Sequence, residues 1–535
     1  MASTIENDLR QAPATRVSVL GIALICLTLA IVASIFARHV KTELGHDQVS
    51  YLFEAQRFLS GAEPYGPQLS ETNPPLIIWF SAIPVQLAHW LHATPQTVFR
   101  ALVFLMLMGC TAWSVALLRR SPNAAFANPL GLYLFGAAIL LTGLVPGRYD
   151  FGQREHLLVL LIVPYVLAVA SGAASRIPLA ERCALGIAAG IAIWFKPHYV
   201  LILIALELFL APRARFLRRL REPEFLAVVL TSVAIFALVL ITTPLYCKQT
   251  VPLLFDTYWA LGTHTTLALA RTLRLYLPLA CGLLLCGVLF RRFLRDWVLF
   301  VALLVCSLAA SVAFVFQHTD WVYHRYPQRA FLLLALSYLA VDLLAPLFNY
   351  LTSSSRSRSL TGFVALGSLI AALCAILVHP HPRREITDLD QIFGKYPSAT
   401  TVYVFSTRVR PLATAYNHNL TWGSRFAHLW MMPAISQNEL GALPPPAPFK
   451  RLPPETLARV AALQRTQSTD DLKYWRPSVV LVEHCDQTNP CQGIEGRTFS
   501  MLDWFLQSPD FAEAWSRYQQ QPSPSPIYDL YTRVQ

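Results

Sequence analysis

Four short polar stretches between long apolar runs hold the residues whose chemistry stands out in this chain. The first is Gly45-His46-Asp47-Gln48, followed by Glu54 and Arg57, and the others are 147–156, 196–199 and 318–326. A carboxylate can take a proton from a hydroxyl group, and arginine binds phosphate through paired N–H groups. Charged groups beside apolar runs are costly, so their concentration in four stretches indicates a site.

The elements that position these stretches are predicted to be membrane-spanning helices. The chain has 535 residues, of which 55% are hydrophobic and 14% are charged, and its mean hydropathy is +0.45. A soluble domain usually carries about 25% charged residues, so the composition excludes a water-soluble core. Apolar runs near the length that crosses a bilayer recur through the first 378 residues. The runs predicted to cross are 17–37, 98–118, 129–146, 156–171, 183–195, 199–211, 225–246, 273–290, 297–316, 330–349 and 361–378.

Basic clusters between the runs predict the orientation of the chain. They include Arg119/Arg120, five arginines at 213–221 and Arg291/Arg292, and the positive-inside rule places all of them in the cytoplasm. That requires the apolar run 75–92, which holds Pro84 and two histidines, to lie at the membrane surface without crossing. We therefore predict an all-α polytopic membrane protein with about eleven transmembrane helices. Its N-terminus is cytoplasmic, and the four polar stretches lie on the external face.

The end of the chain has a different character. We expect a transmembrane domain over 1–379, with a first external loop at 38–97 that contains surface helices, and a small external α/β domain over 380–535. Strand-like runs cover 401–406, 479–482 and 527–531, and a helix-like stretch covers 499–518; Pro-rich 443–454 and polar 465–476 divide the tail. Cys485 and Cys491 flank a polar, turn-rich stretch, which predicts a local disulfide in an oxidising compartment.

The order of these motifs resembles the GT-C superfamily of membrane glycosyltransferases. The closest branch is the protein O-mannosyltransferase and lipid A aminoarabinose transferase group. The resemblance rests on an external-loop aspartate, Asp47, then a Gly61-x-x-Pro64-Tyr65 step and Asn73-Pro74-Pro75-Leu76, and it covers residues 17–212. In that group the first external loop carries a catalytic acidic residue, which matches Asp47. A second acidic residue follows the third crossing and matches Asp150, and a lysine–proline break between short helices matches Lys196-Pro197.

Two positions depart from the pattern of this group. Gln48 follows Asp47 where relatives often carry an acidic pair, and Asn73 stands where many have a lysine. The first loop therefore lacks one common cation. The run 152–156, Gly-Gln-Arg-Glu-His, is richer in charge than the usual second motif and is the candidate to compensate.

The resemblance implies a glycosyltransferase that takes a sugar from a polyprenyl-phosphate donor on the external side. We predict that Asp47 accepts the proton of the acceptor hydroxyl, and that Asp150 orients the acceptor or holds a cation. Cations must stabilise the leaving phosphate; the candidates are Arg148, Arg154, Lys196 and Arg325. Residues expected to support the site or the acceptor are Glu54, Glu155, His156, His318 and His324.

Each assignment has a structural alternative. Asp47 could cap the helix that follows it, Asp150 could form a salt bridge with a neighbouring arginine, and Lys196 could extend to the membrane interface. A divalent metal between Asp47, Asp150 and nearby histidines is chemically reasonable, but the spacing does not demonstrate it, so the cofactor stays unknown. For the whole protein, the alternative is a transporter, flippase or ligase of lipid-linked sugars with the same basic loops.

The expected partners follow from this interpretation. They are a lipid-linked sugar donor, membrane lipids, and a cell-envelope glycan, lipid or protein as acceptor. The net charge of +12 is explained by the cytoplasmic clusters, so no nucleic acid is expected. The expected location is a bacterial inner membrane with the C-terminal domain in the periplasm. The sugar, the acceptor and the oligomeric state are left open.

Overall fold

The computed structural model describes most of the chain between residues 44 and 534. The described residues are 44–122, 126–144, 150–211, 216–262, 276–317, 321–353, 387–441, 449–494 and 497–534, with a few more at 30–37 and 269–274. The predicted crossing at 361–378 and most of the one at 17–37 lie outside this part of the chain.

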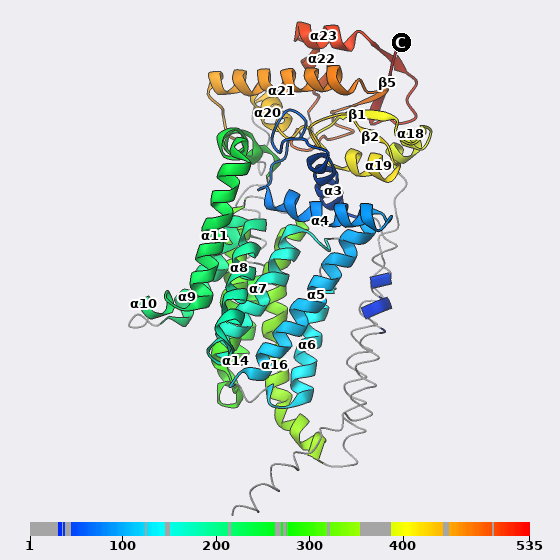
Figure 1. Ribbon diagram of the computed structural model, residues 1–535. Coiled ribbons are helices and arrows are strands. Elements are labelled where there is room, and N and C mark those ends of the chain that lie inside the picture. Colours follow the sequence, from blue (N-terminus) through cyan, green and yellow to red (C-terminus); the bar gives the residue numbers. More distant parts are fainter. Residues whose placement is uncertain are drawn as a thin grey trace, which may run out of the picture.

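Long apolar helices form the body of the protein (Figure 1). They are α5 (Pro95–Arg120), α6 (Pro129–Leu144), α7 (Arg154–Ala170), α8 (Leu179–Phe195), α9 (Val200–Leu210), α11 (Pro223–Thr242), α14 (Leu277–Leu289), α15 (Trp297–Phe316) and α16 (Tyr326–Ser353). Each coincides with an apolar run that predicted a crossing. Four described segments, at 95–120, 223–242, 297–316 and 322–344, are long and apolar enough to span a membrane by length and composition. The total of eleven crossings therefore stays a prediction.

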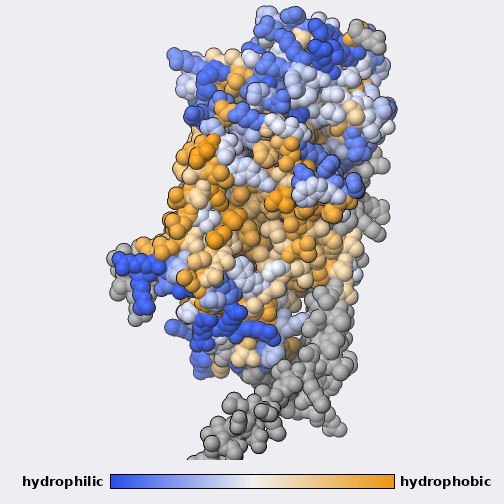
Figure 2. Space-filling model, viewed as in Figure 1, coloured by the Kyte–Doolittle hydropathy of each residue, from blue (hydrophilic) through white to orange (hydrophobic). Residues whose placement is uncertain are grey.

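Local sequence explains how these helices begin and how closely they pack. Thr94 begins α5: its hydroxyl accepts a hydrogen bond from the Thr97 N–H, and Pro95 follows in the first turn. Gly186 and Gly190 lie on α8, and a Cβ at either position would collide with α11, at the Glu224 carbonyl or at Thr231. Small residues four apart thus let two apolar helices approach closely. Figure 2 shows the resulting apolar belt, with polar surfaces at both ends.

Two helices of the first external loop lie at one end of the bundle. They are α3 (His46–Leu59) and α4 (Leu76–Trp90), and Figure 1 shows α4 running across the end of α5 instead of continuing along the bundle. This orientation agrees with the surface helix predicted for 75–92. α3 is deeply embedded, since its residues from Gln48 to Ala55 are all buried.

A five-stranded sheet follows in the C-terminal part, in the order β2-β1-β3-β5-β4. The strands are β1 (Thr401–Phe405), β2 (Thr421–Trp422), β3 (Val479–Glu483), β4 (Tyr518–Gln521) and β5 (Tyr528–Arg533). β1 is parallel to β2 and β3, and β5 is antiparallel to β3 and β4. The strands predicted at 401–406, 479–482 and 527–531 are confirmed. The helix-like stretch 499–518 holds two short helices, α22 (Met501–Leu506) and α23 (Pro509–Trp515).

One boundary predicted within the tail is wrong. The polar stretch 465–476 does not divide the tail, because it forms the second half of the helix α21 (Pro454–Trp475). Polar residues fit there because α21 lies over the sheet and several of its side chains are exposed. The other helices of this part are α18 (Asp388–Phe393), α19 (Arg410–Asn417) and α20 (Met432–Leu440).

Arg57, at the end of α3, joins the C-terminal part to the first external loop. Its guanidinium donates to the carbonyl of Gln68 at 2.7 Å and to those of Trp422 and Ser424 at 2.6 Å. The same group lies 4.5 Å from the ring centroid of Trp475. Charged donors make the stronger hydrogen bonds, so this residue fixes the sheet and its helices to the end of the bundle.

Candidate active site

A cavity of about 580 Å³ lies where the bundle, the first external loop and the C-terminal part meet. Asp47, Asp150 and Arg154, three of the predicted site residues, are among the residues that line it. Its wall comes from separate parts of the chain: 46–51, 70–73, 150–154, 258–261, 321–323, and Val409, Ala427, His428, Trp430 and Gln492 of the C-terminal part.

Asp47 lies in the first turn of α3 and faces charged and polar neighbours. Its Oδ2 accepts a hydrogen bond of 2.9 Å from the Gln153 side chain, and its Oδ1 lies 3.3 Å from His46 Nε2. Burial alone would raise the pKa of Asp47, but the charges of His46 and Arg154 and the hydrogen bonds hold that pKa below its ordinary value. The carboxylate is therefore ionised at neutral pH and able to accept a proton. Its side chain makes no N-terminal cap, since Gly45 occupies that position.

Arg154 begins α7 and is the cation of this wall. Its Nε donates to the Tyr51 hydroxyl at 3.0 Å, and its Nη1 donates to the Asn73 side chain. Tyr51 in turn donates to Gln153 at 3.2 Å. The guanidinium thus lies beside Asn73, the position at which the sequence lacks the lysine common in the resembling group. The charged run 152–156 therefore places a cation next to this position, and its compensation for the missing lysine stays a prediction.

Glu54 and Glu71 form a carboxyl pair next to the cavity. Glu71 lines the cavity and accepts hydrogen bonds from the backbone N–H groups of Thr72 and Asn73, both at 2.7 Å. Glu54 is 2% exposed and accepts from the Ser50 hydroxyl at 2.8 Å. Burial, and then the nearby charge of Glu71, raises the pKa of Glu54 well above its ordinary value. The raised pKa favours the protonated form of Glu54, and Glu71 holds the turn that carries Asn73.

Asp150 lines the cavity from the loop before α7. Burial, and then the charges of Glu155 and Asp47, raises the pKa of Asp150 to about 7, while Arg329 acts in the opposite direction. The salt bridge to Arg154 offered as its structural alternative does not form, because Arg154 turns toward Tyr51 and Asn73.

Three predicted residues form a buried cluster behind the cavity wall. The Lys196 ammonium lies 2.7 Å from Glu155 and 3.0 Å from His324 Nε2, and the three side chains are 5% exposed or less. None of them lines the cavity. Their predicted contacts with phosphate or acceptor stay predictions, and the structure gives Lys196 a carboxylate partner instead.

The remaining predicted residues fall into three groups. His156 lies within the bundle, where Nδ1 accepts from the Gly152 N–H at 3.2 Å and Nε2 lies 2.8 Å from the Gly143 carbonyl. Arg325 lies outside the cavity wall, with its guanidinium 5.8 Å from the Phe314 ring centroid. Arg148 and His318 lie outside the described residues.

A narrow apolar groove of about 200 Å³ lies between α14 and α15. Leu277, Leu308 and Val312 are among the residues that line it, and Tyr276 lies at its polar end. Arg329 donates to the Tyr276 hydroxyl at 2.6 Å. Arg329 also acts electrostatically on Asp150 of the cavity wall. The sequence analysis did not select Arg329.

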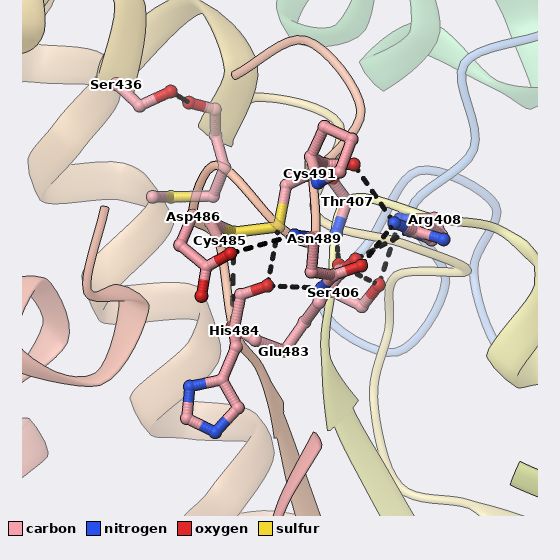
Figure 3. Close-up of a disulfide and its surroundings, with 12 residues drawn as sticks. Ser406, Thr407, Arg408, Ser436, Glu483, His484, Cys485, Asp486, Asn489 and Cys491 are labelled. Carbon is pink, nitrogen blue, oxygen red and sulfur yellow. Dashed lines mark hydrogen bonds and ion pairs between the residues drawn. A yellow bond between two sulfur atoms is a disulfide. The ribbon is translucent and has the colours of Figure 1, made fainter. Parts of the chain in front are cut away.

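The C-terminal part closes the cavity with loops that follow its strands. Cys485 and Cys491 form a disulfide with a Cα–Cα separation of 5.1 Å, and Gln492 comes directly after it. Figure 3 shows Arg408 reaching from the end of β1 toward this loop. Its guanidinium lies 2.6 Å from Glu483 and donates to Asn489 at 3.0 Å. Val409 follows the carboxyl end of β1, and Gln492 follows that of β3. Because these strands are parallel neighbours, both residues reach the same side of the cavity.

About half of the residues that line the cavity lie outside the stretches selected from the sequence. Glu71 left a weak signal, since it precedes the Asn73-Pro74-Pro75 motif by two residues. His428 and Trp430 left none, because only the docking of the C-terminal part brings them to the cavity. For a metal site, the described residues contain no group of three or more His, Cys, Asp or Glu side chains placed to hold an ion.

Comparison with known proteins shows a relationship in fold. No family model and no curated protein matches the sequence. The structure of ArnT from Cupriavidus metallidurans bound to undecaprenyl phosphate matches with a TM-score of 0.55 and 14% identity, covering 95% of this chain and 98% of that chain. Its apo structure matches with a TM-score of 0.53 and 14% identity, covering 96% and 98%. The chain therefore has the polytopic fold of these structures, and the resemblance drawn from its motifs is confirmed at the level of fold.

Proposed function

We propose that this protein is a glycosyltransferase that moves a sugar from a polyprenyl-phosphate donor to a hydroxyl group, with Asp47 as the base. The observation that carries the proposal is the cavity in which an ionised Asp47 and Arg154 lie on one wall. The fold shared with ArnT supports it, because one of those structures holds undecaprenyl phosphate. The proposed setting is a bacterial inner membrane, with residues 1–379 as the membrane domain and 380–535 in the periplasm.

The proposed reaction balances as a single displacement. The acceptor hydroxyl oxygen bonds to the anomeric carbon of the sugar, and the bond between that carbon and the phosphate oxygen breaks. The electron pair leaves with polyprenyl phosphate, and the hydroxyl proton moves to Asp47, which later releases it to water. Charge grows on the leaving phosphate, so a preorganised cation lowers the barrier. Arg154 supplies that cation from within the wall.

The donor lipid has a separate place in this proposal. Its apolar tail lies in the groove between α14 and α15, and its phosphate lies where the groove meets the cavity, with Arg154 on the cavity side and Arg329, bonded to Tyr276, on the groove side. A long isoprenoid chain needs an apolar path that opens to the membrane, and the groove is lined almost wholly by apolar side chains. The sugar then projects from the groove into the cavity, toward Asp47.

The test is a transfer assay on the purified full chain. A panel of radiolabelled polyprenyl-phosphate sugars is incubated with the protein and a membrane extract, and transferred label is counted. Asp47→Asn should reduce transfer by about 10²–10⁴-fold, the usual contribution of a general base, without changing the thermal stability. Asp510→Asn is the matched control, because Asp510 is exposed on α23.

The assay also separates the alternatives. Full transfer by Asp47→Asn would remove that residue from the mechanism. Label that stays on the carrier, although the lipid binds tightly, would favour a transporter or flippase of lipid-linked sugars.

A further inference from the structure

The cavity has two chemically different halves. The half formed by the first external loop and the loop before α7 carries the charged groups Asp47, Glu71, Asp150 and Arg154. The half formed by the C-terminal part, which we call the roof, consists of Val409, Ala427, His428, Trp430 and Gln492. The roof thus offers an amide, an imidazole and an indole, and it contributes no carboxylate, lysine or arginine to the described wall.

Gln492 is the most direct recognition group of the roof. Its side chain lines the cavity and makes no hydrogen bond with another described residue, whereas Gln153 on the opposite wall is bonded to Asp47 and Tyr51. An amide carries both donors and an acceptor. It is therefore suited to a ligand that presents hydroxyl groups, each of which donates and accepts.

His428 and Trp430 add to this preference. Trp430 Nε1 and His428 Nδ1 are buried and have no hydrogen-bond partner among the described residues. Buried polar atoms are nearly always paired, so two unpaired ring nitrogens in one cavity wall point to a ligand. Burial also lowers the pKa of His428 to about 4, so its ring is neutral at pH 7. Both nitrogens are shielded from solvent, so a ligand reaches them after a rotation of the rings.

The charges of the opposite half restrict what the ligand can be. Three carboxyl groups, Asp47, Glu71 and Asp150, share the described lining with one guanidinium, Arg154, and with His46, whose ring lies 3.3 Å from Asp47. In the proposed reaction that guanidinium serves the leaving phosphate of the donor. A second phosphate on the acceptor would meet carboxylates without a cation of its own, and like charges at close range are unfavourable.

We propose that the roof is the acceptor subsite and that it binds an uncharged sugar, whose hydroxyl group faces Asp47. This inference rests on the proposed function and names its acceptor as a neutral glycan end, not a phosphorylated one. Trp430 provides an aromatic face and an N–H group, and Gln492 bonds to the hydroxyls of the same ring. Pockets of this composition fix a ligand by shape and a few placed polar groups.

The roof is held rigidly enough to act as a template. Ser70 donates its N–H to the Arg425 carbonyl at 3.0 Å, and Arg425 forms a buried ion pair of 2.7 Å with Asp471 of α21. Arg57 fixes the neighbouring residues 422 and 424, and the disulfide closes the loop before Gln492. With the backbone of the roof held in this way, the change required for acceptor binding is limited to the rotation of the two rings.

The test measures binding directly, on the full chain in a detergent without a sugar headgroup. Saturation-transfer NMR is recorded with maltose, cellobiose and lactose, each beside its own 1-phosphate. A neutral disaccharide should give the stronger signal of its pair. Gln492→Ala, and Trp430→Phe, which keeps the aromatic face, should each weaken its binding about three- to tenfold, the effect of one neutral hydrogen bond. Gln391→Ala is the control, because Gln391 is exposed on α18.

The outcomes are distinct from those of the transfer assay. Equal or tighter binding of the phosphates, no signal from any neutral disaccharide, or roof variants that bind like the wild type would each overturn the acceptor subsite. Roof-dependent binding together with unchanged transfer in Asp47→Asn would keep the subsite and overturn the mechanism. Thermal melting of each variant shows whether it has folded.

Discussion

The two ends of the helix bundle both bury charged residues, but they treat them in opposite ways. At the end far from the cavity, Arg219 bonds Glu207 at 2.6 Å and Glu224 at 2.9 Å, and Arg182 bonds Glu224 at 2.7 Å. Tyr165 donates to Glu207 at 2.6 Å. Each of these carboxylates has an arginine partner. At the cavity end, Glu54 faces another carboxyl group and Asp150 has a pKa of about 7.

This difference separates a structural network from the site that we propose to be reactive. A buried ion pair with all its hydrogen bonds made is inert, and its removal is felt in stability. Carboxyl groups without a cationic partner have perturbed pKa values, and such values are common at catalytic sites. Substitutions at the far end should therefore change mainly stability, and substitutions at the cavity end should change mainly activity.

The largest effect is expected from Arg219→Met. The substitution leaves Glu207 and Glu224 buried with an incomplete set of partners, so the free energy of unfolding should fall by about 3–5 kcal/mol. Unfolding in mixed micelles titrated with SDS measures this. Arg218→Met, at an exposed neighbouring position, should change little. If Arg219→Met retained wild-type stability, the far end would not be a structural network.

Arg154→Gln tests the cavity end with a similar change. Transfer should slow by about 10²–10³-fold, as when one preorganised group that stabilises developing charge is removed, while stability falls less than in Arg219→Met. Single-turnover rates measure the loss, and Arg119→Gln at the far end is the control. If the variant were destabilised like Arg219→Met but transferred normally when folded, Arg154 would contribute to stability and not to transfer.

The same carboxyl-to-amide change at both ends gives the sharpest contrast. Glu207→Gln weakens charge-assisted bonds to Arg219 and should cost about 1–3 kcal/mol of stability. Glu54→Gln should cost less than about 0.5 kcal/mol, because Glu54 is already uncharged and an amide donates to Glu71 as the protonated acid does. The SDS titration measures both variants. Equal losses would mean that Glu54 is ionised and the comparison fails there.

The cavity end also predicts a pH dependence of stability, which we assign to Asp150. Its pKa is about 7 in the folded protein and about 3.9 in an unfolded chain, so between these values only the folded state keeps the proton. The stability of the wild type relative to Asp150→Asn should therefore fall as the pH rises from about 4 to about 7, and then stay level. Melting temperatures of both proteins across this range measure it. A difference that grows with pH would reverse the assignment.

The sequence predicted the long apolar helices of the described bundle because length and apolarity are local properties. It also predicted the strands near 401, 479 and 527, and the surface helix that became α4. It selected Asp47, Asp150 and Arg154 because charged residues beside apolar runs are rare. The same reasoning selected Lys196, which the structure pairs with Glu155 behind the cavity wall, and its contact with phosphate stays a prediction.

What the sequence could not predict depends on contacts between distant segments. His428 and Trp430 lie in a loop of the C-terminal part, and no pattern in the sequence near them predicts contact with the first external loop. The network at the far end was not anticipated either, since Glu207 and Glu224 have partners on other helices. Pairing in space, not residue type, decides which buried charge is structural and which is reactive.

The Arg57 contacts also set an order of events during synthesis. Arg57 and its acceptor Trp422 are separated by 365 residues, so at typical translation rates of about 5–20 residues per second the partner emerges roughly 20–70 s later. Through that interval the nascent chain has inserted helices but no roof over Asp47. A chain that terminates before residue 422 should stay in that state, so the cavity is complete only after the C-terminal part has been made.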